Sequence, residues 1–247
     1  MKELDKLKDD FMATVSHEIR TPLTSIRSFS EILRDNPDLD AAERKEFVSI
    51  IVAESERLSR LINDILDLSK MEAGTTQWSF EVVDPGPIIE QAILATSGLF
   101  AKAPRITLTS DIAADMPPIR VDRDRLMQVV INLVSNAVKF TDKDGGNVLV
   151  RAFAANGEVR VDIADNGVGI ASEDQERIFE RFQQAGNTLT DKPQGTGLGL
   201  PICRQILRHF GGDIWVESAL GQGSKFSFSV PIAQSAGAAS SSTRVAA

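Results

Sequence analysis

The sequence SHEIRTPL, at residues 16–23, decides how the first third of the chain is interpreted. It places His17, one of only two histidines, directly before Glu18 and inside a long amphipathic helical pattern. A lone histidine on a helix is usually an ordinary surface or core residue. The adjacent carboxylate and the helical context make His17 a candidate for chemistry instead.

Two apolar patterns with helical spacing fill residues 1–73 on either side of this motif. The first comprises Leu4, Leu7, Phe11, Val15, Ile19, Ile26, Phe29 and Leu33. The second comprises Phe47, Ile51, Leu58, Leu61, Ile65 and Leu68, and Glu54 interrupts its repeat. Between the two patterns, Pro37 breaks the helix and either Asp38 or Asp40 can cap the next one.

The first 74 residues are therefore predicted to form a helical hairpin with one apolar seam on each helix. A two-helix hairpin cannot bury both seams by itself, so pairing with a second copy into a four-helix bundle is expected. The sequence thus predicts a homodimer.

After Gly74 the pattern changes to strands mixed with helices. Strands are expected at 78–83, 106–110, 148–152, 159–163, 213–218 and 224–230, and helices at 86–101, 122–140, 172–179 and 199–210. The pair Asn156-Gly157 is a strong hairpin signal. These elements predict an α+β protein in which a mostly antiparallel sheet, covered on one face by helices, forms an α/β sandwich. The tail at 233–247, rich in Ser and Ala, is expected to be disordered.

Three further motifs follow the histidine motif in order: NLVSNAVKF at 132–140, DNGVGI at 165–170 and GTGLGL at 195–200. All four resemble the sequence boxes of sensor histidine kinases of two-component systems. The resemblance implies a dimerisation and phosphotransfer domain at 1–74 and a gyrase-like catalytic ATP-binding domain at 75–232. It also implies that His17 accepts a phosphoryl group from ATP.

The motif at 132–140 places Asn132, Asn136 and Lys139 on one face of the expected helix, apart from its apolar stripe. The alternative interpretation is a solvated polar stripe. Asparagine is a poor residue inside a helix, however, and its amide oxygen is a ligand suited to Mg²⁺. By resemblance, Asn136 is the Mg²⁺ ligand, and Asn132 and Lys139 lie near the nucleotide.

The two glycine motifs have different roles in the family. Asp165-Asn166-Gly167 alone would read as a turn, but the resemblance implies that Asp165 accepts a hydrogen bond from the adenine amino group. The three alternating glycines at 195–199 precede a helix, where backbone amides can reach phosphate oxygens. Their spacing matches neither the dinucleotide fingerprint nor a Walker loop.

A fifth segment, IFERF at 178–182, resembles the F box of the family, and the polar stretch 183–194 after it is typical of a mobile lid. Many relatives have an arginine where this chain has Gln184, although Arg181 and Lys192 remain available for the γ-phosphate. We interpret His209, near the end of a helix, as structural. The expected nucleotide-binding set is Asn132, Asn136, Lys139, Phe140, Asp165, Gly167, Gly169, Ile170, Phe179, Arg181, Gly195, Thr196, Gly197, Leu198, Gly199 and Leu200.

The expected reaction is ATP-dependent autophosphorylation of His17, with ATP and Mg²⁺ as cofactors, followed by transfer to an aspartate of a response-regulator receiver domain. The resemblance implies that Glu18 takes the imidazole proton. It also suggests phosphatase activity toward the regulator, with Thr21 orienting the attacking water. Two alternatives remain open: a non-catalytic dimeric scaffold with a degenerate ATP site, and a gyrase-type ATPase that leaves the His17 motif without a purpose.

Composition limits the partners. The formal net charge of −8 and the absence of a basic run argue against nucleic-acid and anionic-membrane surfaces. Cys203 is the single cysteine, which excludes an internal disulfide and a cysteine-built zinc site and favours a buried thiol. No apolar run approaches the ~18–20 residues of a membrane span. We interpret the chain as a cytoplasmic fragment of a longer receptor, with a membrane sensor possible upstream.

Overall fold

The computed structural model describes residues 2–141, 145–183 and 196–233. The chain divides into two compact units: residues 1–76 with 180–202, and residues 77–179 with 203–247. The first unit contains the helical hairpin, and the second contains the mixed α/β elements.

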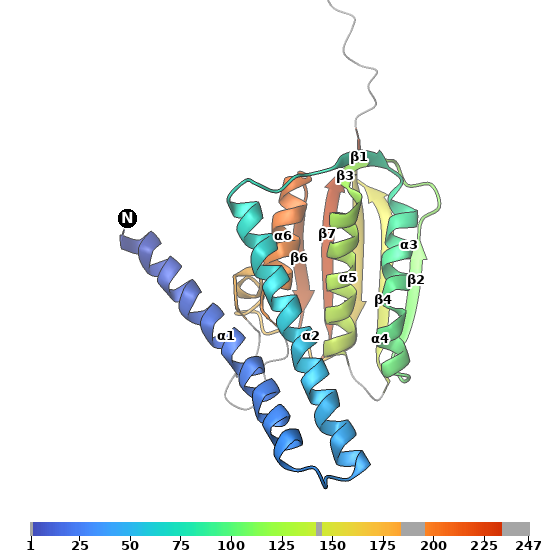
Figure 1. Cartoon of the computed structure of the whole chain (residues 1–247). Helices are drawn as coiled ribbons and strands as arrows, with labels where there is room; N and C mark the ends of the chain where they lie inside the picture. Colours follow the sequence, from blue (N-terminus) through green and yellow to red (C-terminus); the bar gives the residue numbers. More distant parts are fainter. Residues whose placement is uncertain (1, 142–144, 184–195, 234–247) are drawn as a thin grey trace, which may run out of the picture. The chain divides into compact units, whose positions relative to one another are not determined.

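The hairpin consists of α1 (Lys2–Asp35) and α2 (Ala41–Glu72), which run side by side (Figure 1). Near the connecting loop, the rings of Phe29 and Phe47 lie 5.3 Å apart. Further along, Val15 of α1 and Leu61 and Leu68 of α2 are buried. The predicted hairpin is confirmed, and α1 continues through Pro22.

Asp40, one of the two candidate caps, begins α2. Its Oδ1 accepts hydrogen bonds from the amides of Ala42 and Glu43, both at 2.8 Å. The Glu43 side chain accepts the Asp40 amide in return at 3.4 Å, which completes a capping box. Two amides of the first turn are thereby satisfied, which favours the start of the helix at Ala41.

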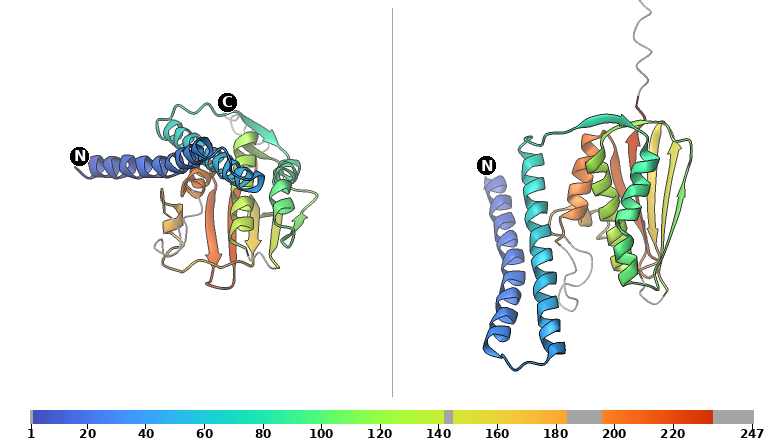
Figure 2. Two further views of the ribbon diagram at one scale, coloured as in Figure 1. Left: turned by 60° about the horizontal axis from the view of Figure 1, so that its bottom comes forward. Right: turned by 45° about the vertical axis from the view of Figure 1, so that its right-hand side comes forward.

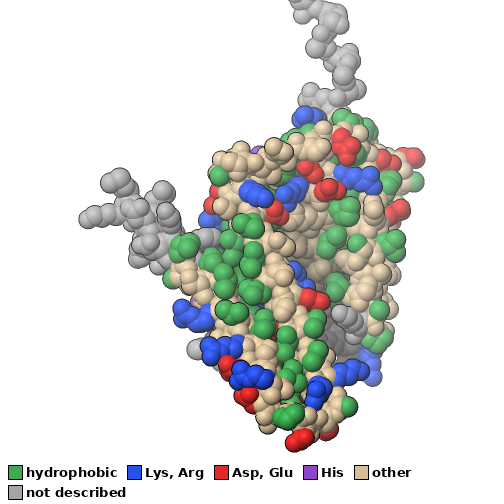
Figure 3. All heavy atoms as spheres, in the orientation of Figure 1, with side chains coloured by type: hydrophobic (Ala, Val, Ile, Leu, Met, Phe, Trp, Pro, Cys, Tyr) green, Lys and Arg blue, Asp and Glu red, His purple; other side chains and the backbone are tan. Residues whose placement is uncertain are grey.

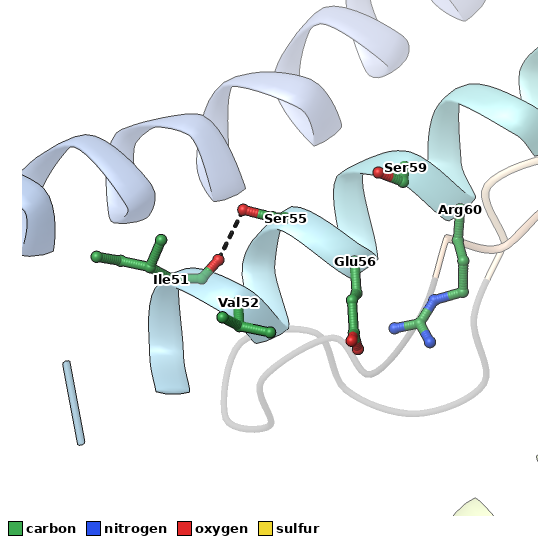
Figure 4. Close-up of a pocket in the computed structure, with 6 residues that line it drawn as sticks. All are labelled: Ile51, Val52, Ser55, Glu56, Ser59 and Arg60. Carbon is green, nitrogen blue, oxygen red and sulfur yellow. Dashed lines mark hydrogen bonds between the residues drawn. The ribbon is translucent and has the colours of Figure 1, made fainter. Parts of the chain in front are cut away.

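A second row of α2 side chains stays exposed on the hairpin, where hydrophobic groups gather in Figure 3. Its members recur at alternating spacings of four and three: Val48, Val52, Ser55, Ser59, Ile62 and Leu66. The two serines are small, and a surface hollow of about 450 Å³ lies along Val52, Ser55, Ser59 and their neighbours (Figure 4). The Ser55 hydroxyl donates to the Ile51 carbonyl at 2.7 Å, so this hydroxyl does not need water as a hydrogen-bond acceptor.

The second unit is built on a five-stranded sheet of order β2-β4-β5-β7-β6. Its strands are β2 (Thr107–Ile112), β4 (Asn147–Ala155), β5 (Glu158–Asp165), β6 (Asp213–Ser218) and β7 (Ser224–Pro231). Only β2 and β4 pair in parallel, so the sheet is mostly antiparallel, as predicted. The turn at Asn156-Gly157 has positive φ at both residues and joins β4 to β5 as the sequence indicated.

Helices cover one face of this sheet (Figure 2). They are α3 (Pro85–Ala95), α4 (Ser97–Lys102), α5 (Arg123–Phe140) and α6 (Gly199–His209), whose residues from Cys203 belong to this unit. Alternate strand residues such as Val150, Val161 and Phe228 meet buried helix residues such as Val130 and form the core. Cys203 is fully buried, which confirms the expected structural thiol.

Two expected elements differ in the structure, and one strand was not expected. The helix expected at 86–101 is interrupted at Thr96, whose hydroxyl and amide both donate to the Ile93 carbonyl. The prediction of a helix at 172–179 is wrong, because within this range the structure forms only a 3₁₀ turn at Arg177–Phe179. A strand that the sequence analysis missed, β3 (Ile119–Asp122), pairs with β1 (Phe80–Val83) in a separate two-stranded sheet.

Candidate functional site

The histidine motif lies on an exposed part of α1. The His17 side chain is 74% exposed, and its Nδ1 lies 3.7 Å from Glu18 Oε1. Glu18 is more shielded, and its other oxygen, Oε2, lies 3.5 Å from the guanidinium of Arg57 on α2. Because Nδ1 faces the carboxylate, Nε2 is the ring nitrogen free to act as a nucleophile.

Thr21 lies one turn after His17 on the same helix. Its hydroxyl donates to the His17 carbonyl at 3.2 Å. Pro22, the next residue, has no N–H to donate. The Thr21 oxygen keeps its lone pairs, so it can still accept a hydrogen bond from a water near the imidazole.

The polar face of α5 is partly buried. The Asn132 amide lies 3.7 Å from Cys203 Sγ, which anchors it to α6. The Asn136 side chain, also partly exposed, has no hydrogen-bond partner within the described ranges. Lys139 Nζ lies 4.4 Å from the ring centroid of the exposed Phe140. An amide that is half-buried and left open fits a ligand role better than a structural one.

Asp165 ends β5, where its Oδ1 accepts the Gly167 amide at 2.9 Å. Burial raises the pKa of this carboxyl, and the amides of Gly167 and Ser224 oppose the rise. A hollow of about 350 Å³ lies beside it, lined mainly by residues of the β6–β7 hairpin, including Glu217, Ser218 and Lys225. Asp165 is the one expected nucleotide-binding residue that lines this hollow.

The glycines of the same motif are needed first for packing within the protein. A Cβ on Gly167 would lie 2.1 Å from the Phe140 carbonyl oxygen, and one on Gly169 would lie 1.9 Å from that of Ala219. Gly169 also has a φ of +71°. The sequence analysis included both glycines in the expected nucleotide-binding set, and the structure shows that each also allows two backbone segments to approach closely.

Asn166 is a residue that the sequence analysis did not single out. Its Oδ1 accepts from the Thr141 hydroxyl at 2.9 Å and from the Asn147 amide at 2.7 Å. It therefore ties the end of α5 to the start of β4. At Ile170, the amide donates to the Ser218 hydroxyl at 2.8 Å, which fixes the other end of the loop.

The segment 180–202 contains the expected residues Arg181, Gly195, Thr196, Gly197, Leu198, Gly199 and Leu200. Gly195 lies outside the described residues, as do Gln184 and Lys192. The Phe182 amide donates to the Gly197 carbonyl at 2.9 Å. Within the same unit, Arg181 pairs with Glu72, and the Thr196 hydroxyl donates to Asp64 at 3.1 Å. Leu198 is buried, while Gly199 and Leu200 begin α6.

Phe179 and His209 are packing residues of the second unit. The ring of Phe179 is buried and lies edge-on to Phe226, with centroids 6.4 Å apart. The imidazole of His209 stacks on Trp78 at 4.3 Å, near the end of α6. This packing gives His209 a structural environment.

Among the described residues, no group of three or more His, Cys, Asp or Glu side chains could hold a metal ion. In the same ranges, none of the helices combines the length and apolar character that a bilayer crossing requires.

Family models match both parts of the chain. Residues 7–74 match the His Kinase A (phospho-acceptor) domain. Residues 121–234 match the histidine kinase-, DNA gyrase B-, and HSP90-like ATPase family. The chain therefore belongs to the histidine kinases, with a phosphoacceptor domain followed by an ATPase-type catalytic domain.

Individual relatives agree. "Drug sensory protein A" of Synechocystis is 41% identical over 244 residues, which is 94% of this chain and 36% of the relative. A solved complex of the histidine kinase ThkA with the response regulator protein TrrA superposes with a TM-score of 0.73, at 29% identity over 94% of this chain and 64% of that one. Full-length ShkA in complex with AMPPNP gives 0.66, at 33% identity over 92% of this chain and 46% of that one. The chain spans a little over a third of the length of the first curated relatives.

Proposed function

We propose that this chain transfers the γ-phosphoryl group of ATP to His17 and then to an aspartate of a response-regulator receiver domain. The observation that carries the proposal is the exposed His17 imidazole with Glu18 at Nδ1. Attack by Nε2 forms the N–P bond while the bond from phosphorus to the ADP oxygen breaks. The Nδ1 proton passes to Glu18, so the phosphorylated imidazole is left neutral.

Nucleotide binding is assigned to the expected nucleotide-binding residues. Asp165 would accept the adenine amino group, because an ionised carboxylate accepts from an exocyclic amine and guanine presents a carbonyl there. Backbone amides at the start of α6 would receive the phosphates. The open amide of Asn136 fits Mg²⁺, which would offset the phosphate charge when bound. Asn132, Lys139 and Arg181 would lie close to the nucleotide.

The proposed partners are a receiver domain and a second copy of the chain. The receiver domain is supported by the ThkA complex, whose partner is a response regulator. The second copy is supported by the phosphoacceptor domain match and the exposed apolar row of α2. Thr21, still able to accept from water, would serve dephosphorylation of the regulator. We place the reaction on the cytoplasmic side of any membrane sensor in the full-length protein.

The scaffold alternative has less support. Asn136 and Asp165 are both present with side chains available for ligands, which a degenerate ATP site would not require. A gyrase-type ATPase would not explain why residues 7–74 match a phosphoacceptor domain.

Replacing the acceptor tests the proposal. Incubation with γ-labelled ATP should label the protein with acid-labile, base-stable phosphate. His17→Ala should abolish the label, while nucleotide binding stays unchanged because His17 lies on α1 and not among the expected nucleotide residues. Retained labelling in His17→Ala would show that the acceptor is another residue.

A further inference from the structure

Glu54 interrupts the apolar seam of α2 and has no part in the reaction proposed above. Its side chain is largely shielded, and its Oε2 is buried without a hydrogen-bond partner among the described residues. A shielded carboxylate costs free energy unless a nearby charge compensates it. Glu54 in the seam is therefore expected to have a neighbouring charge that compensates it.

The partner is Arg57, one turn further along α2. Arg57 NH1 lies 3.8 Å from Glu54 Oε2, and its NH2 lies 3.5 Å from Glu18 Oε2 on α1. All three side chains are 20–27% exposed. A cation thus stands between two carboxylates, one from each helix, in surroundings that screen charge less than open water does.

Glu18 divides its two oxygens between different partners. Oε2 faces Arg57, and Oε1 faces Nδ1 of His17. A carboxylate held at one oxygen has fewer orientations available to the other. The contact with Arg57 therefore aims Oε1 at the imidazole and thereby favours the tautomer that leaves Nε2 free.

Glu54 fixes the other side of this arrangement. Its Oε2 faces NH1 of the same guanidinium whose NH2 faces Glu18. Arg57 is therefore held between two carboxylates, and its orientation toward Glu18 depends on Glu54.

We propose that Arg57 and Glu54 are positioning residues for His17 and act on the imidazole through Glu18. This inference rests on the proposed function. In the phosphoryl transfer the proton still passes from Nδ1 to Glu18, and neither Arg57 nor Glu54 gains or loses one. The competing interpretation is an ion-pair cluster that only holds the two helices together.

A double-mutant cycle on the full chain separates the two interpretations. Arg57→Met keeps much of the side-chain packing and should lower kcat for autophosphorylation about 10- to 100-fold, the scale of a misplaced catalytic group. The KM for ATP should not change. In a Glu18→Gln background, Arg57→Met should change kcat less than about twofold, because its target is already lost. Losses that simply multiply would overturn the inference.

Glu54→Gln provides a second, nearly isosteric variant in case Arg57→Met fails to fold. It should lower kcat in the wild-type background and have little further effect in Glu18→Gln. Arg27→Met is the matched control, because the Arg27–Glu31 pair lies exposed on α1 at 2.8 Å, and kcat should stay unchanged. A wild-type chain that acquires no acid-labile phosphate refutes the proposed function itself. Normal labelling with an unaffected Glu54→Gln variant refutes only this inference.

Discussion

At Asn136 the side-chain amide lacks a hydrogen-bond partner among the described residues, although the side chain is only partly exposed. If the amide oxygen binds Mg²⁺, Asn136→Ala should weaken Mg²⁺-dependent nucleotide binding by more than about tenfold, or ~1.4 kcal/mol. Titrating Mg²⁺ in the presence of a fluorescent ATP analogue measures this effect. Asn36→Ala, in the exposed hairpin loop, is the control. Identical titrations for Asn136→Ala and wild type would exclude a ligand role.

The Asp165 carboxylate, which is expected to bind the nucleotide, should lower the stability of the nucleotide-free protein at neutral pH. Because burial raises its pKa, the folded state holds this proton more tightly than the unfolded chain. The contribution of Asp165 to stability is thus greatest below the unfolded value of 3.8 and is lost as pH rises through the higher folded pKa. Asp165→Asn should therefore raise the thermal midpoint of the nucleotide-free protein at pH 7, with a smaller difference near pH 4.

The same variant should bind ATP about 10- to 100-fold more weakly, because it loses a charge-assisted hydrogen bond to adenine. Thermal unfolding across pH and nucleotide titration together test both parts. At each pH the midpoint of Asp165→Asn is compared with that of the wild type. If the variant raised the midpoint less at pH 7 than at pH 4, the assigned cost of burying Asp165 would be contradicted.

At the scale of single elements, α2 depends on its N-cap. The sequence analysis offered both Asp38 and Asp40 for this position. Asp40→Ala removes both side-chain bonds to the first-turn amides and should destabilise the hairpin by ~1 kcal/mol. Asp38→Ala is the matched control, because Asp40 and not Asp38 forms the cap, and should have little effect. Denaturant unfolding of the full chain followed by circular dichroism measures both. Equal losses for the two variants would show that the capping box contributes nothing.

Elements with strong local signals were predictable, and those fixed by distant partners were not. The spacing of apolar residues and Asp122 at the N-cap place α5 correctly. β3 has only four residues and follows Pro117-Pro118, and its partner β1 lies some forty residues away, so nothing local marks it. Residues 172–176 read as helical, but Gln175 donates its side-chain amide to the Ile170 and Ser218 carbonyls and anchors a turn instead.

The candidate site shows the same division. His17, Asn136 and Asp165 could be predicted as site residues because each belongs to a recognisable motif. Asn166, Arg57 and the packing role of Gly167 were missed because their partners lie on other elements. For Glu54 the signal was visible as an interruption of the apolar pattern, but its meaning depends on Arg57 and the facing helix.

For the molecule as a whole, the exposed row on α2 has the four-three spacing of a helical bundle seam. Its hydrophobic members would remain in water in a monomer, and its serines are small and line the hollow of Figure 4. Burial of such a row is worth about 25 cal/mol per Å² of apolar surface removed from water. A second copy of the hairpin supplies that burial without any other partner.

Val52→Glu should therefore convert the protein from dimer to monomer, because it places a carboxylate in this apolar row, where association would remove its hydration. Light scattering over a range of protein concentrations measures the change. Leu94→Glu is the control, since Leu94 is 71% exposed on α3 of the second unit and should leave the dimer intact. A Val52→Glu protein that stays dimeric with unchanged affinity would show that α2 does not form the contact. If Leu94→Glu alone dissociates the dimer, the contact lies on the second unit.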